Sequence, residues 1–132
     1  MKLTQLHIGS RKAGMTLLEL TVVILVLLSL ISILFVGARA WKKGSDRSAN
    51  ILNIRNVQQA VRGHQNMNSL LDGAPLLKGV IIPSYLKDPA VPAASLTYTF
   101  GGNVPAIGIL YLAVSGTDAA DYAPTAGTTS DW

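Results

Sequence analysis

The chain has 132 residues, 11 of them Lys or Arg against 7 Asp or Glu, and it has no cysteine. This length allows one small domain beside a membrane helix, and the lack of cysteine excludes disulfides and a lipoprotein anchor. Three of the basic residues, Lys2, Arg11 and Lys12, lie in the first 14 positions. The chain from Met15 onward therefore carries eight basic against seven acidic side chains, so its charge does not indicate a nucleic-acid partner.

A long apolar run follows these first residues. From Leu20 to Ala38 the chain has no charged residue and no proline. As a helix this run spans about 28 Å, close to the hydrocarbon thickness of a bilayer, so we predict a membrane helix. The carboxylate of Glu19 lies at the start of this run, where burial in lipid costs about 2 to 3 kcal/mol unless a partner meets it. An acid in this position is a candidate functional residue.

The residues around Glu19 form a motif. Arg11-Lys12-Ala13-Gly14 followed by Met15-Thr16-Leu17-Leu18-Glu19-Leu20 resembles the processing site of type IV prepilins and type II secretion pseudopilins. The resemblance implies that a prepilin peptidase cuts between Gly14 and Met15 and that the new amino terminus can be methylated. Met15 stands where the family usually has phenylalanine. The resemblance also implies that Glu19 of one copy neutralises the freed amine of Met15 in a neighbouring copy.

The resemblance further implies a fold and a location. The expected fold is α+β and pilin-like, with a long N-terminal helix packed on a small antiparallel sheet. Residues 1–14 would be a cytoplasmic leader, 15–40 the transmembrane half of the helix, 41–72 its amphipathic half, and 73–132 a small periplasmic β domain with a C-terminal loop. The expected location is the bacterial inner membrane, crossed once. Expected partners are other copies, related pilins and the inner-membrane assembly platform.

An ordinary secretory signal is the alternative for the N-terminal part. Ala38-Arg39-Ala40 has the small-x-small form that a general signal peptidase accepts, which would leave Trp41 as the first residue. The apolar run is about twice the usual length for such a signal, and Glu19 would be unexplained within it. Trp41 beside Lys42 instead fits an interfacial anchor at the end of a membrane span.

Residues 46–72 show helical periodicity, and no proline occurs before Pro75. We therefore predict one helix continuous with the membrane span and ending at Asp72-Gly73-Ala74-Pro75. Apolar and weakly polar residues recur every three or four positions and should cover the core, whereas the charged and glutamine residues fall largely elsewhere. The predicted stripe is Ile51, Ile54, Val57, Val61, His64, Asn68 and Leu71, and the residues off it are Arg55, Gln58, Gln59, Arg62 and Gln65. For His64 the pattern favours the edge of the core over a metal site.

Two strands are predicted after this helix. Leu96–Phe100 alternates, with Leu96, Tyr98 and Phe100 on one face, and 107–115 is denser in apolar residues, which predicts a largely buried strand. Two strands alone are marginal in water, so they need the apolar stripe of the helix. The segment 80–89 resembles the region before the first strand of major pseudopilins, although Ala90-Val91-Pro92 replaces the usual tryptophan and glycine.

The tail, residues 115–132, is rich in Gly, Ala, Thr and Asp and predicts a loop. It resembles the ending of major pseudopilins, in which calcium pins the loop. The candidate ligands are Ser115, Asp118 and Asp121, although the spacing is not that of an EF-hand and a solvated acidic loop is the alternative. Basic residues precede Asp88 and acidic ones dominate after it, which suggests contacts between the tail of one copy and the helix of the next.

The sequence contains no catalytic pattern. It has no Gly-rich phosphate loop, no Cys/His pair and no zinc spacing, so we expect a structural protein and not an enzyme. The expected function is a subunit of a type IV filament, in a type II secretion pseudopilus involved in protein secretion. One alternative is a surface or competence pilus subunit acting in adhesion, motility or DNA uptake. An alternative of another class is a bitopic membrane protein with a periplasmic binding domain.

Overall fold

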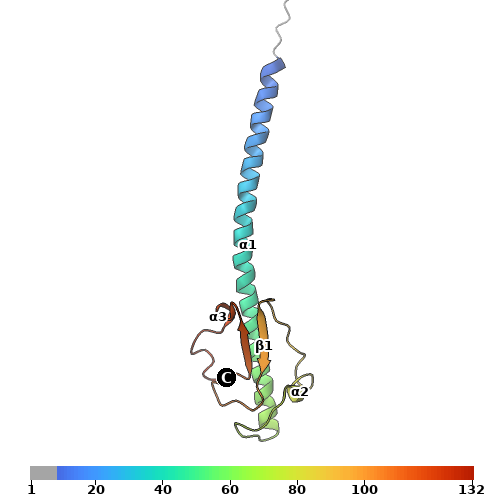
Figure 1. Ribbon diagram of the computed structural model, residues 1–132, viewed down its shortest axis with the longest axis vertical. Helices are drawn as coiled ribbons and strands as arrows, with labels where there is room; N and C mark the ends of the chain where they lie inside the picture. Colours follow the sequence, from blue (N-terminus) through green and yellow to red (C-terminus); the bar gives the residue numbers. More distant parts are fainter. Residues whose placement is uncertain (1–8) are drawn as a thin grey trace, which may run out of the picture. The chain divides into compact units, whose positions relative to one another are not determined.

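The computed structural model describes the backbone of residues 9–132 and the side chains from Thr16 onward. Residues 1–8 of the predicted leader lie outside this part. Along the chain follow helix α1, helix α2, strand β1, strand β2 and helix α3 (Figure 1). Their bounds are Gly9–Met67, Lys78–Ile81, Leu96–Phe100, Leu112–Gly116 and Ala119–Tyr122. The chain divides into two compact units after Trp41, and its layout is α+β, as predicted.

Helix α1 is continuous, which confirms the prediction of one helix that continues from the apolar run into residues 46–67. Its end was predicted wrongly. The helix stops at Met67, about a turn before Asp72, because Ser69 takes a left-handed conformation with φ +51°. Asn68 contributes to this end, since its side-chain amide donates to the carbonyl of His64 at 2.9 Å and satisfies a group of the last turn. Asn68 and Leu71 therefore lie outside the buried stripe, and Leu71 is 82% exposed.

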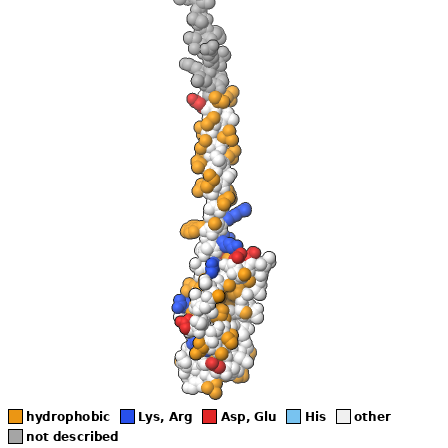
Figure 2. All heavy atoms as spheres, turned by 90° about the vertical axis from the view of Figure 1, so that its left-hand side faces the viewer, with side chains coloured by type: hydrophobic (Ala, Val, Ile, Leu, Met, Phe, Trp, Pro, Cys, Tyr) orange, Lys and Arg blue, Asp and Glu red, His pale blue; other side chains and the backbone are white. Residues whose placement is uncertain are grey.

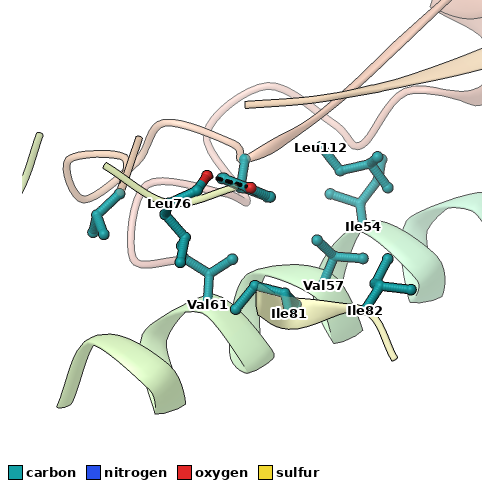
Figure 3. Packing of buried hydrophobic residues seen from close by; sticks show 9 residues of the cluster. Ile54, Val57, Val61, Leu76, Ile81, Ile82 and Leu112 are labelled. Carbon is teal, nitrogen blue, oxygen red and sulfur yellow. Dashed lines mark hydrogen bonds between the residues drawn. The ribbon is translucent and has the colours of Figure 1, made fainter. Parts of the chain in front are cut away.

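The core of the second unit lies between α1 and the segments that follow it. Ile54, Val57 and Val61 of α1 are at most 1% exposed and contact Leu76, Ile81, Ile82 and Leu112, as Figure 3 shows. Strand β1 has the predicted bounds, and its alternate residues Tyr98 and Phe100 pack against this cluster. The predicted packing of the two strands on the helix stripe is thus confirmed.

Strand β2 is shorter than predicted. It pairs with β1 in antiparallel register, from Phe100 opposite Leu112 to Leu96 opposite Gly116. Residues 107–111 do not belong to it, because the N–H of Ile109 bonds to the carbonyl of Ala106 and Gly108, with φ +85°, turns the chain. The expected burial of this strand is also wrong, since only Leu112 of β2 is fully buried.

Two amide side chains of α1 are buried, and one was predicted on the polar side. Gln58 is 2% exposed, accepts from the N–H of Tyr111 and donates to the carbonyl of Ile109, both at 3.0 Å. Asn50 is 0% exposed, accepts from the hydroxyl of Tyr98 at 2.7 Å and donates to the carbonyl of Tyr122 at 2.9 Å. Gln58 thus joins the helix to the segment before β2, and Asn50 joins it to β1 and α3. In each amide, the oxygen accepts and the nitrogen donates a hydrogen bond.

The tail is not a plain loop, because it contains α3. Tyr122 at the end of this short helix is 8% exposed. The tail is attached to α1 at several points: Lys43 forms an ion pair with Asp121 at 2.6 Å, and an Arg62 guanidinium N–H donates to the main-chain oxygen of Trp132 at 3.1 Å. The tail therefore meets the basic helix of its own chain.

Candidate functional site: the exposed apolar helix and its acidic residue

The first part of α1 exposes apolar side chains around its whole circumference. Large side chains from Leu17 to Val36 are exposed by 48% to 72%, and Figure 2 shows apolar side chains along the visible face of the helix below the grey residues. An 18-residue window here has a mean hydropathy of 3.0 and no buried residue. This is one helix that is long and apolar enough to cross a membrane. A helix that is hydrophobic all round is normally covered by lipid or by other helices.

The hydroxyls in this segment are turned back onto the helix. Thr21 donates to the carbonyl of Leu17, Ser29 to that of Leu25 at 2.9 Å, and Ser32 to that of Leu28 at 2.8 Å. Each hydroxyl proton is therefore satisfied without water. The segment presents no unsatisfied hydroxyl donor at these positions, which suits an apolar environment.

Glu19 is the exception in this surface. Its side chain is exposed, and within the described part of the chain it makes no hydrogen bond or ion pair. Gly14 and Met15 fall inside the bounds of α1, but the side chain of Met15 is outside the described side chains. In a helix, four residues make slightly more than one turn, so Met15 and Glu19 lie on the same face. The carboxylate thus stands near the predicted new amino terminus, in a segment with no other charge up to Ala38.

The opposite end of the apolar run is marked by Trp41, whose side chain is 83% exposed. Arg39 and Lys42 beside it are exposed and form no ion pair with any residue from Thr16 onward. Lys43, by contrast, is paired with Asp121. A tryptophan between free cations is the side-chain pattern of a membrane interface.

The three calcium candidates lie at the end of β2 and around α3. Ser115 lies in β2 opposite Thr97, and Asp118 precedes α3 with an exposed side chain. The ammonium of Lys43 bonds to Asp121 and lowers the pKa of that carboxyl, while Asp121 raises the pKa of Lys43. Among residues 9–132 no group of three His, Cys, Asp or Glu side chains is placed to hold a metal ion. One carboxylate oxygen of Asp121 is thus engaged by a cation of the helix.

His64 is half-buried and lies at the edge of the core, as expected. Its Nδ1 is 3.1 Å from the hydroxyl of Tyr85 and 3.1 Å from the side-chain amide nitrogen of Asn68. The two rings meet edge to face, with centroids 5.4 Å apart. These contacts give His64 a structural role.

The polar residues that hold the tail were missed at the level of sequence. Asn50 had a detectable signal, because it precedes Ile54 by four positions and so continues the buried stripe. Arg62 had none: its guanidinium bonds to the carbonyl of Pro105 at 2.7 Å and to the oxygen of Trp132, both far away in sequence. The position of Asn50 in the helical period, and not its residue type, indicates that its side chain is buried.

Comparisons with protein-family models, with curated proteins and with solved structures found no match for this chain. The resemblance to type IV prepilins therefore depends on the motif around Gly14, on the segment 80–89 and on the tail.

Proposed function

We propose that this chain is a structural, non-enzymatic subunit of a type IV filament, of the kind found in type II secretion pseudopili. Residues 15–40 would hold it in the bacterial inner membrane before assembly and form the filament core afterwards. The domain after residue 73 would lie in the periplasm. A prepilin peptidase would release the amino terminus of Met15, and the inner-membrane platform would add the subunit to the filament.

The observation that carries the proposal is the exposed, unpaired carboxylate of Glu19 on a helix surface that is otherwise apolar. Burying this group in lipid costs about 2 to 3 kcal/mol unless it is paired. A cut after Gly14 creates an ammonium one turn away, which is equally costly in the same place. Two such groups from neighbouring copies satisfy each other, so the bundle contains no isolated charge.

The same pairing would set the register between copies. Met15 and Glu19 are separated by about 6 Å along the helix axis, so contact between the amine of one copy and the acid of the next fixes their axial shift. Apolar contacts alone do not distinguish one shift from another as sharply. A single polar pair in an apolar helix bundle has this effect in other systems. Glu19 would thus determine register as well as affinity.

The first test is the intact mass of the protein isolated from membranes of its native host. We expect the mass of the chain from Met15 onward, with or without one methyl group. A chain that begins at Trp41, or one that keeps its first 14 residues in the assembled state, would contradict the proposal.

The second test compares Glu19→Ala with Ser32→Ala in assembly. Ser32 lies in the same segment and its hydroxyl bonds to the chain itself, so its loss should leave the surface apolar. We expect Glu19→Ala to lower the sedimentable filament at least tenfold and Ser32→Ala to leave it unchanged. A membrane receptor that does not polymerise would be unaffected by either change, and a surface pilus would differ in where the filament is found.

A further inference from the structure

Lys42 and Asp46 are a cation and an acid that lie four residues apart in α1. Lys42 is exposed and Asp46 is half-buried. Within the part of the chain that the structure describes, neither side chain forms a hydrogen bond or an ion pair. Lys43, the next cation along the helix, is paired with Asp121 instead. One face of the helix shortly after Trp41 thus carries an unpaired charge of each sign.

The helix does not favour a bond between these two side chains. At a spacing of four residues, an ion pair is more stable when the acid precedes the cation, and here the cation comes first. The structure agrees, since among residues 16–132 the ammonium of Lys42 and the carboxylate of Asp46 are not paired with each other. Both charges therefore remain available to a partner outside the chain.

The pair repeats the spacing of Met15 and Glu19. Met15, whose amine a cut after Gly14 would free, precedes Glu19 by four residues, and Lys42 precedes Asp46 by four. Asp46 is also the next acidic residue after Glu19 in the chain. The apolar run is thus flanked by two pairs in which a cation comes first and an acid follows about 6 Å further along the helix.

We propose that Asp46 of one copy forms an ion pair with Lys42 of the next. The inference rests on the proposed function, in which Glu19 of one copy meets the freed amine of Met15 in the next. That contact shifts two identical, parallel helices by four residues, and the same shift applies along their whole length. It therefore brings Asp46 to the level of Lys42 in the same neighbour, with no further displacement.

The side chains can make this contact between packed helices. Neighbouring helices lie about 8 to 10 Å apart, and the flexible four-carbon stem of lysine carries its ammonium across much of that distance. The two side chains therefore need not point directly at each other. Copies without a shift would place Lys42 beside Lys42 and Asp46 beside Asp46, so like charges disfavour that register. The pair thus contributes to the choice of register more than to affinity.

Charge reversal tests each partner alone. Lys42→Glu and Asp46→Lys each place like charges at the contact, and we expect either to lower the sedimentable filament at least fivefold, relative to the amount of chain in the membrane. Lys87→Glu is the matched control, because Lys87 is exposed and forms no ion pair with the described residues. Filament yields that stay normal in both variants would overturn the inference.

Co-expression of the two variants shows whether the pair joins different chains. In an alternating filament, the acid introduced at position 42 of one variant meets the lysine introduced at position 46 of the other, and the remaining Lys42 and Asp46 also meet. We therefore expect the mixture to regain at least half of the wild-type filament. Lys87→Glu mixed with Asp46→Lys has the same total charge and should not regain it. Recovery only in the double variant Lys42→Glu/Asp46→Lys would place the pair within one chain, and that result, or no recovery at all, would overturn the inference.

The two proposals fail in different ways. If filaments form and depend on Glu19 but tolerate both charge reversals, the second ion pair is wrong and the filament function stands. If the wild-type chain is not processed after Gly14 and never assembles, the filament function is wrong and the second ion pair falls with it.

Discussion

Replacing Gln58 by leucine should destabilise the second unit, even though leucine is the more apolar side chain and the position is buried. The side chain is 2% exposed and joins α1 to the segment before β2 through two hydrogen bonds of 3.0 Å. Leucine has a similar size but can form neither bond. The buried N–H of Tyr111 then has no acceptor, which costs about 1 to 3 kcal/mol. The carbonyl of Ile109 loses its donor but lies on a residue that is 59% exposed, so it costs less, about 1 kcal/mol.

The expected total is about 2 to 4 kcal/mol, a large part of the 5 to about 15 kcal/mol that stabilises a typical domain. For a unit of this size, it corresponds to an unfolding temperature lower by roughly 10 to 25 °C. The assay is thermal unfolding of the full chain in detergent, followed by near-UV circular dichroism of the tyrosines. Gln59→Leu is the control, because Gln59 is the exposed neighbour and should shift the midpoint very little. If both variants unfold at the same temperature, the buried amide does not join the two layers as described.

Four further outcomes follow from single contacts. Val61→Ala should lower the free energy of unfolding by about 2 kcal/mol in a urea titration, because Val61 is 0% exposed. Leu71→Ala should change it by no more than about 0.5 kcal/mol, because Leu71 was predicted in the core but is 82% exposed. The pKa of Asp121 is lowered from its ordinary value of 3.8, so the contribution of its ion pair to stability is present above pH 3.8 and is lost as the pH falls further. In that acidic range the α3 amides should lose protection from hydrogen exchange. The Lys43→Met variant should not show this change. A calcium chelator should leave the unfolding temperature unchanged, because the Lys43 ammonium already occupies that carboxylate. Gly116→Ala should cost at least about 2 kcal/mol, since φ is +142° and a Cβ would lie 2.0 Å from the oxygen of Ser95, and failure to see a change would exclude this backbone geometry.

The elements that sequence predicts well are those whose pattern is local. Strand β1 alternates over five residues with its apolar side toward the helix, and its bounds were predicted without error. Helix α1 has no proline to break it, and its continuity followed from that. Both results depend on neighbours within one element. No contact that is distant in the sequence is needed to predict either of them.

The errors occur where a distant or an irregular contact decides the outcome. Gln58 is buried where it accepts a hydrogen bond from the N–H of Tyr111, which lies 53 positions later. No residue close to Gln58 in the sequence indicates this contact. Residues 107–111 are apolar enough for a strand, but Gly108 turns the chain and leaves Ile107 71% exposed. The helix ends early because Ser69 takes a left-handed conformation and Asn68 bonds to the last turn, local events that the apolar period does not record.

The candidate site differs from these errors, because the residues that define it are adjacent in the sequence and contact nothing from the rest of the described chain. The second half of α1 buries one stripe against its own sheet, whereas the first half buries none of its apolar surface. One continuous helix thus satisfies one half within the molecule and leaves the other half to be covered by lipid or by other copies. Lipid covers apolar side chains well but gives nothing to a carboxylate. Under the proposed function, Glu19 is the residue that separates the two environments: a helix made only to stay in lipid has no use for it, and a helix that must leave the lipid in a fixed register with its neighbours does.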